Sequence, residues 1–211
     1  MKVLVASRNA KKLKELQRVL QAADVQGIEL VSLADIDEYP ESPETGATFV
    51  ANAQIKTQDG VRYAGLPTIA DDSGIRVDRL NGMPGVLSAR WSGTHGDDAA
   101  NNALLLAQLK DITDPEERGA QFVSACVLQL PADLAEQTGM QEVYAVEGVW
   151  EGSLLMEEQG AGGFGYDPLF SPAEEPGCSA AELSPERKDE LSHRGKALAQ
   201  LVEPLRRLAQ H

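Results

Sequence analysis

Two adjacent carboxylates after an apolar run are the residues best suited to chemistry. Residues 66–70 (LPTIA) lead directly into Asp71-Asp72-Ser73-Gly74. We expect the apolar run to be a buried strand, and ligands collect at the carboxyl ends of strands in open α/β sheets. Carboxylates there can hold a hard divalent cation, which in turn binds phosphate oxygens, or can act as a general base toward water. An Asp-rich turn would have the same composition, because Asp, Ser and Gly all favour turns.

The polar turn at residues 7–12 (SRNAKK) is a second group with possible chemistry. It follows a short apolar run and opens an amphipathic helix, whose N-terminus offers unpaired N–H groups and partial positive charge to an anion. Ser7 and Asn9 would add side-chain donors, and Lys12 could reach back to the same anion. Asn52 and Lys56, four residues apart on a later helix, share one face, so Lys56 could also meet a phosphate. Solvated polar side chains remain the alternative for both segments.

A glycine-rich run at residues 160–168 (GAGGFGYDP) has the composition of a base-binding loop. Its glycines permit close approach of the backbone to a ligand, and Phe164 and Tyr166 offer flat faces on which a base can stack. Asp167 could accept a hydrogen bond from a ring N–H or a ribose hydroxyl. A flexible loop with core aromatics is the alternative.

Basic donors gather at the start of the last helix. His193 and Arg194 follow Ser192, and Lys188 lies a little upstream. Donors of this kind suit the acceptor edge of an oxo-purine. The alternative is a helix capped by Ser192 with solvated basic residues behind it.

Strand and helix patterns alternate along the chain, which predicts an α/β fold built on one sheet. A long hairpin near the middle, with a polar connecting loop, would form a second lobe. The predicted strands are residues 2–6, 28–33, 66–70, 75–77, 121–130 and 141–155, and the predicted helices are residues 10–22, 48–64, 97–109, a short one from 184, and 192–208.

Length and charge limit the function classes. The chain has 211 residues, of which 42% are hydrophobic, so it can bury the core of one domain. Its net charge of −14 argues against binding to nucleic acid or to an anionic membrane. Cys126 and Cys178 cannot form a disulfide framework and fit a reducing cytoplasm. The apolar run at the N-terminus is too short for a signal peptide, and no stretch has the length of a membrane span. We expect a soluble cytoplasmic protein.

Taken in order, these motifs closely resemble those of the inosine/xanthosine triphosphate pyrophosphatase family. The resemblance extends from Val3 to Leu201. The segments that carry it are Ser7-x-Asn9-x-x-Lys12, Glu44-Thr45-Gly46-Ala47-Thr48-Phe49 with Asn52-Ala53 and Lys56, Ala70-Asp71-Asp72-Ser73-Gly74, Gly82-x-Pro84-Gly85 with Ser88-Ala89-Arg90-Trp91-Ser92-Gly93, Gly162-Gly163-Phe164-Gly165-Tyr166-Asp167-Pro168 and Ser192-His193-Arg194-Gly195. Each motif is short, but six in this order are specific.

The resemblance implies a mixed, strongly curved sheet with flanking helices. Residues 1–211 would form one domain of two lobes around a cleft, with the long hairpin at about 119–155, and the protein would be a homodimer. The implied reaction is Mg²⁺-dependent cleavage between the α and β phosphates of ITP, dITP and XTP, which gives the monophosphate and pyrophosphate and cleanses the nucleotide pool.

The resemblance also implies roles for individual residues. Asp72 falls on the catalytic acid, which serves the metal and activates water, and Asp71 is its neighbour at the metal. Ser73 falls on a substrate contact. The triphosphate would be held by the turn Ser7, Arg8, Asn9, Ala10, Lys11 and Lys12, with Lys56 nearby. The base would be held by Phe164, Gly165, Tyr166, Asp167, Lys188, His193 and Arg194.

Two positions depart from the family pattern. Ala51 stands where a Glu that often helps to hold Mg²⁺ is usual, so the metal affinity could be weaker or Glu44 could substitute. Arg8 stands where Gly is usual, and it could contact phosphate or point to solvent. Two other functions stay open: a nucleotide-binding regulator that has lost turnover, and a pyrophosphatase for other modified nucleotides.

Overall fold

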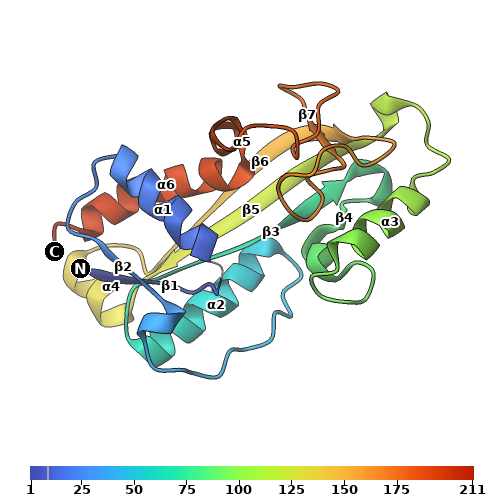
Figure 1. The fold of residues 1–211 in the computed structure, drawn as a ribbon. Helices are drawn as coiled ribbons and strands as arrows, with labels where there is room; N and C mark the ends of the chain where they lie inside the picture. The colour runs from blue at the N-terminus through green and yellow to red at the C-terminus, as the bar shows by residue number, and fades with distance from the viewer. Residues whose placement is uncertain (9) are drawn as a thin grey trace. The chain divides into compact units, whose positions relative to one another are not determined.

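The computed structural model describes residues 1–8 and 10–211 (Figure 1). The predicted contact of Asn9 with phosphate therefore lies outside the described residues, as do the side chains of Ala10 and Lys11. The chain divides into two compact units. Unit 1 comprises Met1–Asp72, Ser124–Gly148 and Arg194–His211, and unit 2 comprises Ser73–Val123 and Val149–His193.

The strands and helices form the mixed α/β fold that the sequence predicts. β1 pairs in parallel with β2 and β3, whereas β4 runs antiparallel to β3 and β7 antiparallel to β6. The hydrogen-bonded order is β2-β1-β3-β5-β6-β7, with β4 on β3. The strands are β1 Lys2–Val5, β2 Glu29–Ser32, β3 Thr68–Val77, β4 Met83–Pro84, β5 Gly119–Gln129, β6 Val143–Leu154 and β7 Phe170–Pro172. The α-helices are α1 Ala10–Ala22, α2 Phe49–Ala64, α3 Asp98–Gln108, α4 Ala132–Thr138, α5 Pro185–Leu191 and α6 His193–Leu208.

In unit 1, helices cover both faces of β1, because successive residues of a strand point to opposite faces. Val3 and Val5 belong to the core that β1 forms with α1 and α6. Leu4 lies on the other face, toward α2, where a Cβ added to Gly60 would meet the Leu4 side chain at 3.1 Å. Figure 1 shows α1 and α6 on one side of these strands and α2 on the other. This arrangement explains why the β1 sequence is apolar without alternation.

The ends of α2 follow from two residues next to it. Thr48 is the N-cap and accepts a hydrogen bond from the Ala51 N–H. Gly65 ends the helix in the left-handed conformation, with φ of 66°. Both residues were predicted for these roles, and both predictions are confirmed.

Unit 2 has a separate core in which α3 packs against the outer halves of the long strands. Leu105 and Leu109 of α3 lie in one cluster with Trp150 and Phe170. Arg118 is buried beside this core and donates hydrogen bonds to the carbonyl oxygens of Leu109, Ile112, Leu154 and Leu155. Because every bond is to a backbone carbonyl, this arginine holds loops together rather than pairing with a carboxylate.

Two predicted element boundaries are wrong. β3 does not end at Ala70 but continues through Asp71 and Asp72 to Val77. Its pairing with β1 ends at Val5 and Ile69, so the two aspartates lie just beyond the carboxyl end of β1 while β3 runs on beside β5. The connection between β5 and β6 is also more than a polar loop. It contains α4, which packs Ala135 into the core of unit 1 and ends at a left-handed Gly139.

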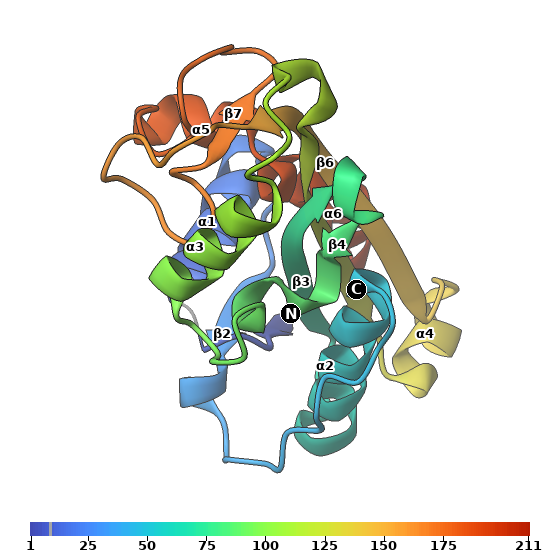
Figure 2. The same ribbon diagram turned by 90° about the vertical axis from the view of Figure 1, so that its right-hand side faces the viewer.

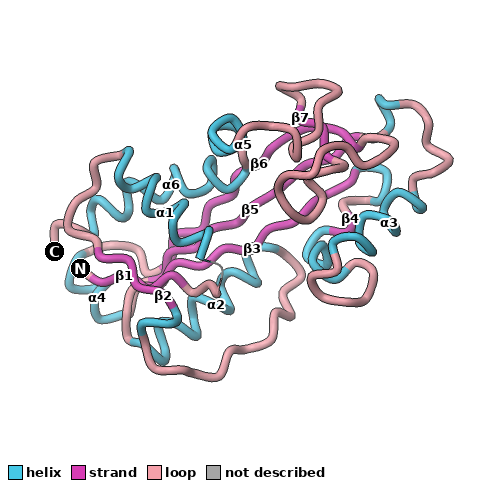
Figure 3. Tube along the Cα trace, in the orientation of Figure 1, coloured by secondary structure: helices cyan, strands magenta, loops and turns pink. Residues whose placement is uncertain are grey.

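Between β2 and α2, the chain forms a short 3-10 turn at Leu33–Asp35 and then runs as an extended loop (Figure 3). Within the described part of the chain, none of the helices combines the length and the apolar composition that crossing a membrane requires.

Candidate functional site

Asp71 is the centre of a buried charge cluster in unit 1. Its side chain lies on β3 and is 8% exposed as a residue. Lys12 Nζ lies 2.8 Å from Asp71 Oδ2, and Arg194 Nε lies 3.4 Å from the same oxygen. Burial by itself raises the pKa of the Asp71 carboxyl, but Lys12 and Arg194 outweigh it and hold that pKa well below its usual range. Asp71 is therefore a permanent anion that gathers two cations.

Arg194 has a second carboxylate partner that sequence reasoning missed. Its Nη1 lies 3.4 Å from Glu15 Oε2, and both side chains are almost buried. Glu15 follows Lys12 by three residues on α1, so the two share a face, and that spacing was the available signal. Arg194 was expected to read the purine, whereas the structure places its guanidinium beside Asp71 and Glu15.

Asp72 has different surroundings, although it is the next residue. Asn52 Nδ2 donates to Asp72 Oδ2 at 2.9 Å, and Lys56 Nζ lies 3.8 Å from Asp72 Oδ1. Burial raises the pKa of the Asp72 carboxyl, and the opposing effects of Lys56 and Asn52 are too weak to cancel it. A partly buried carboxylate with a raised pKa is suited to accept a proton.

Lys56 places one positive charge among oxygen atoms. Its Nζ lies 3.0 Å from Glu44 Oε1 and donates to the backbone carbonyl of Asp71 at 3.0 Å, in addition to its proximity to Asp72. Among the described residues, no group of three or more His, Cys, Asp or Glu side chains is arranged to hold a metal ion. However, the oxygen donors that surround Lys56 are the kind that Mg²⁺ prefers, so the donor set fits a hard cation.

One face of α2 brings Glu44 to this position. Asn52, Lys56 and Asp59 recur at helical spacing, and each holds a residue of the preceding loop. Their partners, in order, are the Gly46 N–H at 2.7 Å, the Glu44 carboxylate at 3.0 Å, and the Ser42 N–H and hydroxyl at 2.7 and 3.0 Å. The loop is thereby aligned along the helix, and Glu44 is fixed near Asp72 instead of lying free in solvent.

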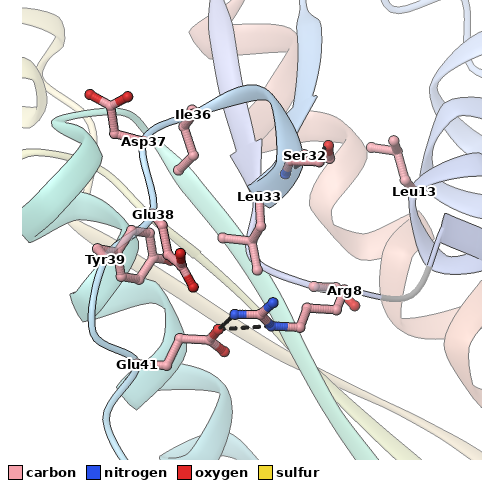
Figure 4. A pocket seen from close by; sticks show the side chains of 11 residues that line it. Arg8, Leu13, Ser32, Leu33, Ile36, Asp37, Glu38, Tyr39 and Glu41 are labelled. Carbon is pink, nitrogen blue, oxygen red and sulfur yellow. Dashed lines mark hydrogen bonds and ion pairs between the residues drawn. The ribbon is translucent and has the colours of Figure 1, made fainter.

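A cavity of about 580 Å³ lies next to the polar turn in unit 1, and Ser7, Arg8 and Leu13 line it together with residues of the 32–41 segment. Figure 4 shows Arg8 reaching toward Glu41, with Leu33 and Tyr39 around them. Arg8 Nε donates to Glu41 Oε1 at 2.9 Å. The pair is well exposed, so it contributes little to stability. Of the two possibilities for Arg8, neither phosphate nor bulk solvent but Glu41 is its partner here.

In unit 2, the glycine-rich loop (residues 160–168) presents one aromatic ring and buries the other. Phe164 is 54% exposed, whereas Tyr166 is 4% exposed and donates its hydroxyl to the Ser88 carbonyl at 2.8 Å. The expectation that Tyr166 offers an open stacking face is therefore wrong. Gly163 and Gly165 adopt positive φ, which reverses the chain so that adjacent aromatics point to opposite sides.

Asp167 and Lys188 organise the exposed side of this loop. Asp167 Oδ2 accepts hydrogen bonds from the Phe164 N–H at 2.7 Å and from Lys188 Nζ. Lys188 Nζ also lies 5.3 Å from the centroid of the Phe164 ring. A Cβ at Gly163 would come within 2.1 Å of Asp167 Oδ2, so only glycine allows this closure.

Two residues of α3 also contact the loop, and sequence reasoning did not single them out. Asp98 accepts a hydrogen bond from the Gly165 N–H, and Asn102 donates one to the Gly165 carbonyl. Nearby in the chain, His193 stacks its ring on Phe122, with centroids 5.1 Å apart and an angle of 12° between the planes.

The sequence profile of the Ham1 family matches residues 3–204, which is nearly the whole chain. The chain belongs to the Ham1 family. This confirms the resemblance that the ordered motifs indicated.

Relatives of this Ham1 chain include a dITP/XTP pyrophosphatase of Corynebacterium jeikeium strain K411, which is 68% identical over 99% of this chain and 100% of the relative. Among solved structures, a nucleoside-triphosphatase / dITP/XTP pyrophosphatase from Mycobacterium abscessus is 58% identical, with a TM-score of 0.79 and coverage of 97% of this chain and 100% of that one. A HAM1 protein from Coxiella burnetii is 37% identical, with a TM-score of 0.84 and coverage of 97% and 98%.

The site residues expected of a Ham1 chain thus form two groups, one in each unit. Unit 1 brings together Lys12, Lys56, Asp71, Asp72 and Arg194, although these come from α1, α2, β3 and α6. Unit 2 brings together Phe164, Asp167 and Lys188. Ser73 lies on β3 directly after Asp72 and begins unit 2. Glu15, Asp98 and Asn102 are the additions that the structure makes to the sequence-based set.

Proposed function

We propose that the protein hydrolyses dITP, ITP and XTP to the monophosphate and pyrophosphate, and so removes non-canonical purine nucleotides from the pool. The observation that carries this proposal is the cluster of Lys12, Lys56 and Arg194 around two adjacent aspartates. A chain with a net charge of −14 repels a triphosphate unless cations are concentrated locally. The names of relatives with up to 68% identity over their full length support the same reaction.

The cations of unit 1 would bind the triphosphate. Lys12 stands in the first turns of α1, where the helix N-terminus adds partial positive charge. Asp71 keeps Lys12 and Arg194 in place before substrate arrives, so little reorganisation is needed when phosphate oxygens approach. Charge stabilisation by fixed groups of this kind is the main protein contribution in phosphoryl-type transfer.

Asp72 would act as the general base. It would take a proton from the water that attacks the α-phosphorus, the bond from that phosphorus to the bridging oxygen would break, and pyrophosphate would leave with the electron pair. The raised pKa of the Asp72 carboxyl favours this role, because a base whose pKa lies closer to neutral pH accepts a proton more readily. Asn52 would orient the carboxylate through its hydrogen bond.

Glu44 and Asp72 would hold Mg²⁺, with Lys56 now near both carboxylates. When bound, the ion would neutralise phosphate charge and polarise the reacting phosphate. Glu44 would then supply the acidic group that Ala51 lacks. Asp71, also expected at the metal, is less suited, because Lys12 and Arg194 already neutralise its carboxylate.

The glycine-rich loop of unit 2 would bind the base. Phe164 would stack on the purine, and Lys188 would donate to the oxo group with His193 and Arg194 as the further donors. Donors that face an oxygen reject an exocyclic amine, because an adenine would leave them unsatisfied. Tyr166 would support the loop from within the core instead of touching the base.

Pyrophosphate release from a panel of ITP, dITP, XTP, ATP and GTP tests the proposal. With Mg²⁺ present, the first three substrates should be cleaved much faster than ATP and GTP. Equal rates for all five would exclude selective cleansing of the pool. Nucleotide binding without pyrophosphate release would identify a regulator, and turnover confined to other modified nucleotides would change the substrate class.

We also propose a single catalytic domain of two lobes, a homodimer, and a location in the cytoplasm without nucleic-acid or membrane partners. The family resemblance supports the domain and the dimer. The two cysteines support a reducing compartment, since both are free thiols, Cys126 buried and Cys178 exposed. Light scattering coupled to gel filtration would give the mass of the particle in solution.

A further inference from the structure

Helix α3 is bonded to the glycine-rich loop at a single residue, Gly165. Asp98 Oδ2 accepts a hydrogen bond from the Gly165 N–H at 2.7 Å, and Asn102 Nδ2 donates one to the Gly165 carbonyl at 3.1 Å. Asp98 and Asn102 are four residues apart, so they lie on one face of the helix. Figure 2 shows the loop passing alongside α3. The helix thus holds both backbone polar groups of Gly165.

Asn102 is a poor choice for packing alone. It is 3% exposed, and its Oδ1 is buried without a hydrogen-bond partner among the described residues. The bond to Gly165 is the one hydrogen bond of its side chain there. A buried, unpaired carbonyl destabilises a fold, and an apolar side chain of similar size would avoid that penalty. The residue therefore weakens the core in exchange for a contact with the loop.

Gly165 sits between the two aromatics with opposite orientations. Its φ of +61° lies in the left-handed region, which is where the chain reverses. On one side, Tyr166 is fixed in the core by its bond to Ser88. On the other side, Phe164 is exposed, and its N–H is bonded to Asp167. Holding Gly165 therefore fixes the direction in which the Phe164 ring is presented.

We propose that Asp98 and Asn102 are positioning residues for the purine base. They hold Gly165 so that Phe164 is already oriented for stacking when the nucleotide arrives, which lowers the ordering penalty of binding. This inference rests on the proposed role of the glycine-rich loop in binding the base. Asp98 and Asn102 act through Gly165 and do not touch the substrate.

The experiment compares Asp98→Ala, Asn102→Leu and the double variant by kcat, KM for ITP and melting temperature. Each single change should raise KM about 5- to 10-fold, the effect of one lost hydrogen bond, and should leave kcat within about 2-fold. Asn102→Leu should keep or raise the melting temperature while it raises KM, which a purely structural residue would not do. The double variant should resemble the single ones, because either loss releases Gly165. Asp98→Asn should restore KM, since its amide oxygen can still accept.

Two further variants distinguish positioning of Gly165 from general weakening of α3 and from a loop that does not bind the base. Asp97→Ala removes the neighbouring N-cap bond to the Ala100 N–H and should lower the melting temperature without raising KM. If Asp97→Ala raises KM as much as Asp98→Ala, general weakening of α3 accounts for the effect and the inference is overturned. Phe164→Ala should raise KM by itself. If it does so while Asp98→Ala and Asn102→Leu leave KM unchanged, the positioning role fails, whereas an unchanged KM in Phe164→Ala would reject the base-binding role of the loop.

Discussion

Asp71 and Asp72 are adjacent on β3, yet their carboxyl pKa values are displaced in opposite directions. Both are removed from water, which raises the pKa of each. For Asp71, two close cations reverse that effect, whereas Asp72 has a more distant Lys56 and one amide donor. Neighbouring carboxyls with separated pKa values can divide two roles between them. We assign cation placement to Asp71 and proton acceptance to Asp72.

The first prediction compares the stability of two isosteric variants in the absence of metal. Asp71→Asn should lower the free energy of unfolding at pH 7 by about 3 kcal/mol, because Lys12 and Arg194 lose the charge that compensates them. Asp72→Asn should leave it unchanged or raise it, because the folded protein no longer holds a buried charge there. Urea unfolding followed by circular dichroism measures both. Equal losses would contradict the separate environments.

The second prediction concerns the pH dependence of that difference. The pKa of Asp71 is lower in the folded than in the unfolded chain, so its contribution is complete above the unfolded value of about 3.9 and is lost as the pH falls toward the folded value. The stability gap between wild type and Asp71→Asn should therefore be constant from pH 7 to about pH 5 and should shrink below about pH 4. A gap that already shrinks between pH 7 and pH 5 would show that the Asp71 pKa is not lowered.

The third prediction is that Asp72→Asn lowers kcat for ITP by at least about 100-fold, since the proton acceptor is removed. Pyrophosphate release under single-turnover conditions measures the chemical step directly. Circular dichroism would check that the variant is folded. Activity close to that of wild type would remove Asp72 from the role of general base.

The fourth prediction tests Glu44 as a metal ligand. Glu44→Gln should raise the Mg²⁺ concentration for half-maximal activity at least about 10-fold, and calorimetric titration with Mg²⁺ should show the same weakening. Glu41→Gln is the matched control, because Glu41 lies in the same loop but pairs with Arg8. Unaltered Mg²⁺ binding in Glu44→Gln, or an equal effect in Glu41→Gln, would show that Glu44 does not replace the missing acid at Ala51.

The fifth prediction concerns base selectivity. Lys188→Ala should lower the ratio of kcat/KM for ITP over ATP by about 10-fold or more, because the donor for the oxo group is lost. Arg187→Ala serves as the control, since Arg187 is the neighbouring cation and pairs with Glu175 and Glu190 on the surface. Steady-state kinetics with both nucleotides gives the ratios. If the two variants keep the wild-type ratio, base recognition depends on other residues.

Local patterns in the sequence were sufficient for most of the elements. The spacing of Leu13 and Leu16 and the polar turn before them predicted α1 with its observed bounds. The cap at Thr48 and the stop at Gly65 predicted α2. These signals work because helix capping and amphipathic spacing depend on residues within a few positions of each other. The continuation of β3 through its aspartates was missed, since a strand that gains a new neighbour has no local mark.

By itself, the sequence determined the family, the reaction and the segments that carry the site, because six short motifs in a fixed order are readable without coordinates. Only the tertiary structure decided which side chains meet within each group. Arg194 lies 123 residues from Asp71 and 179 from Glu15 along the chain, and both pairs form only when α6, α1 and β3 pack together. The burial of Tyr166 and the hold of α3 on Gly165 were likewise decided there. Side-chain contacts between distant segments depend on packing, and packing has no signature within a short stretch of sequence.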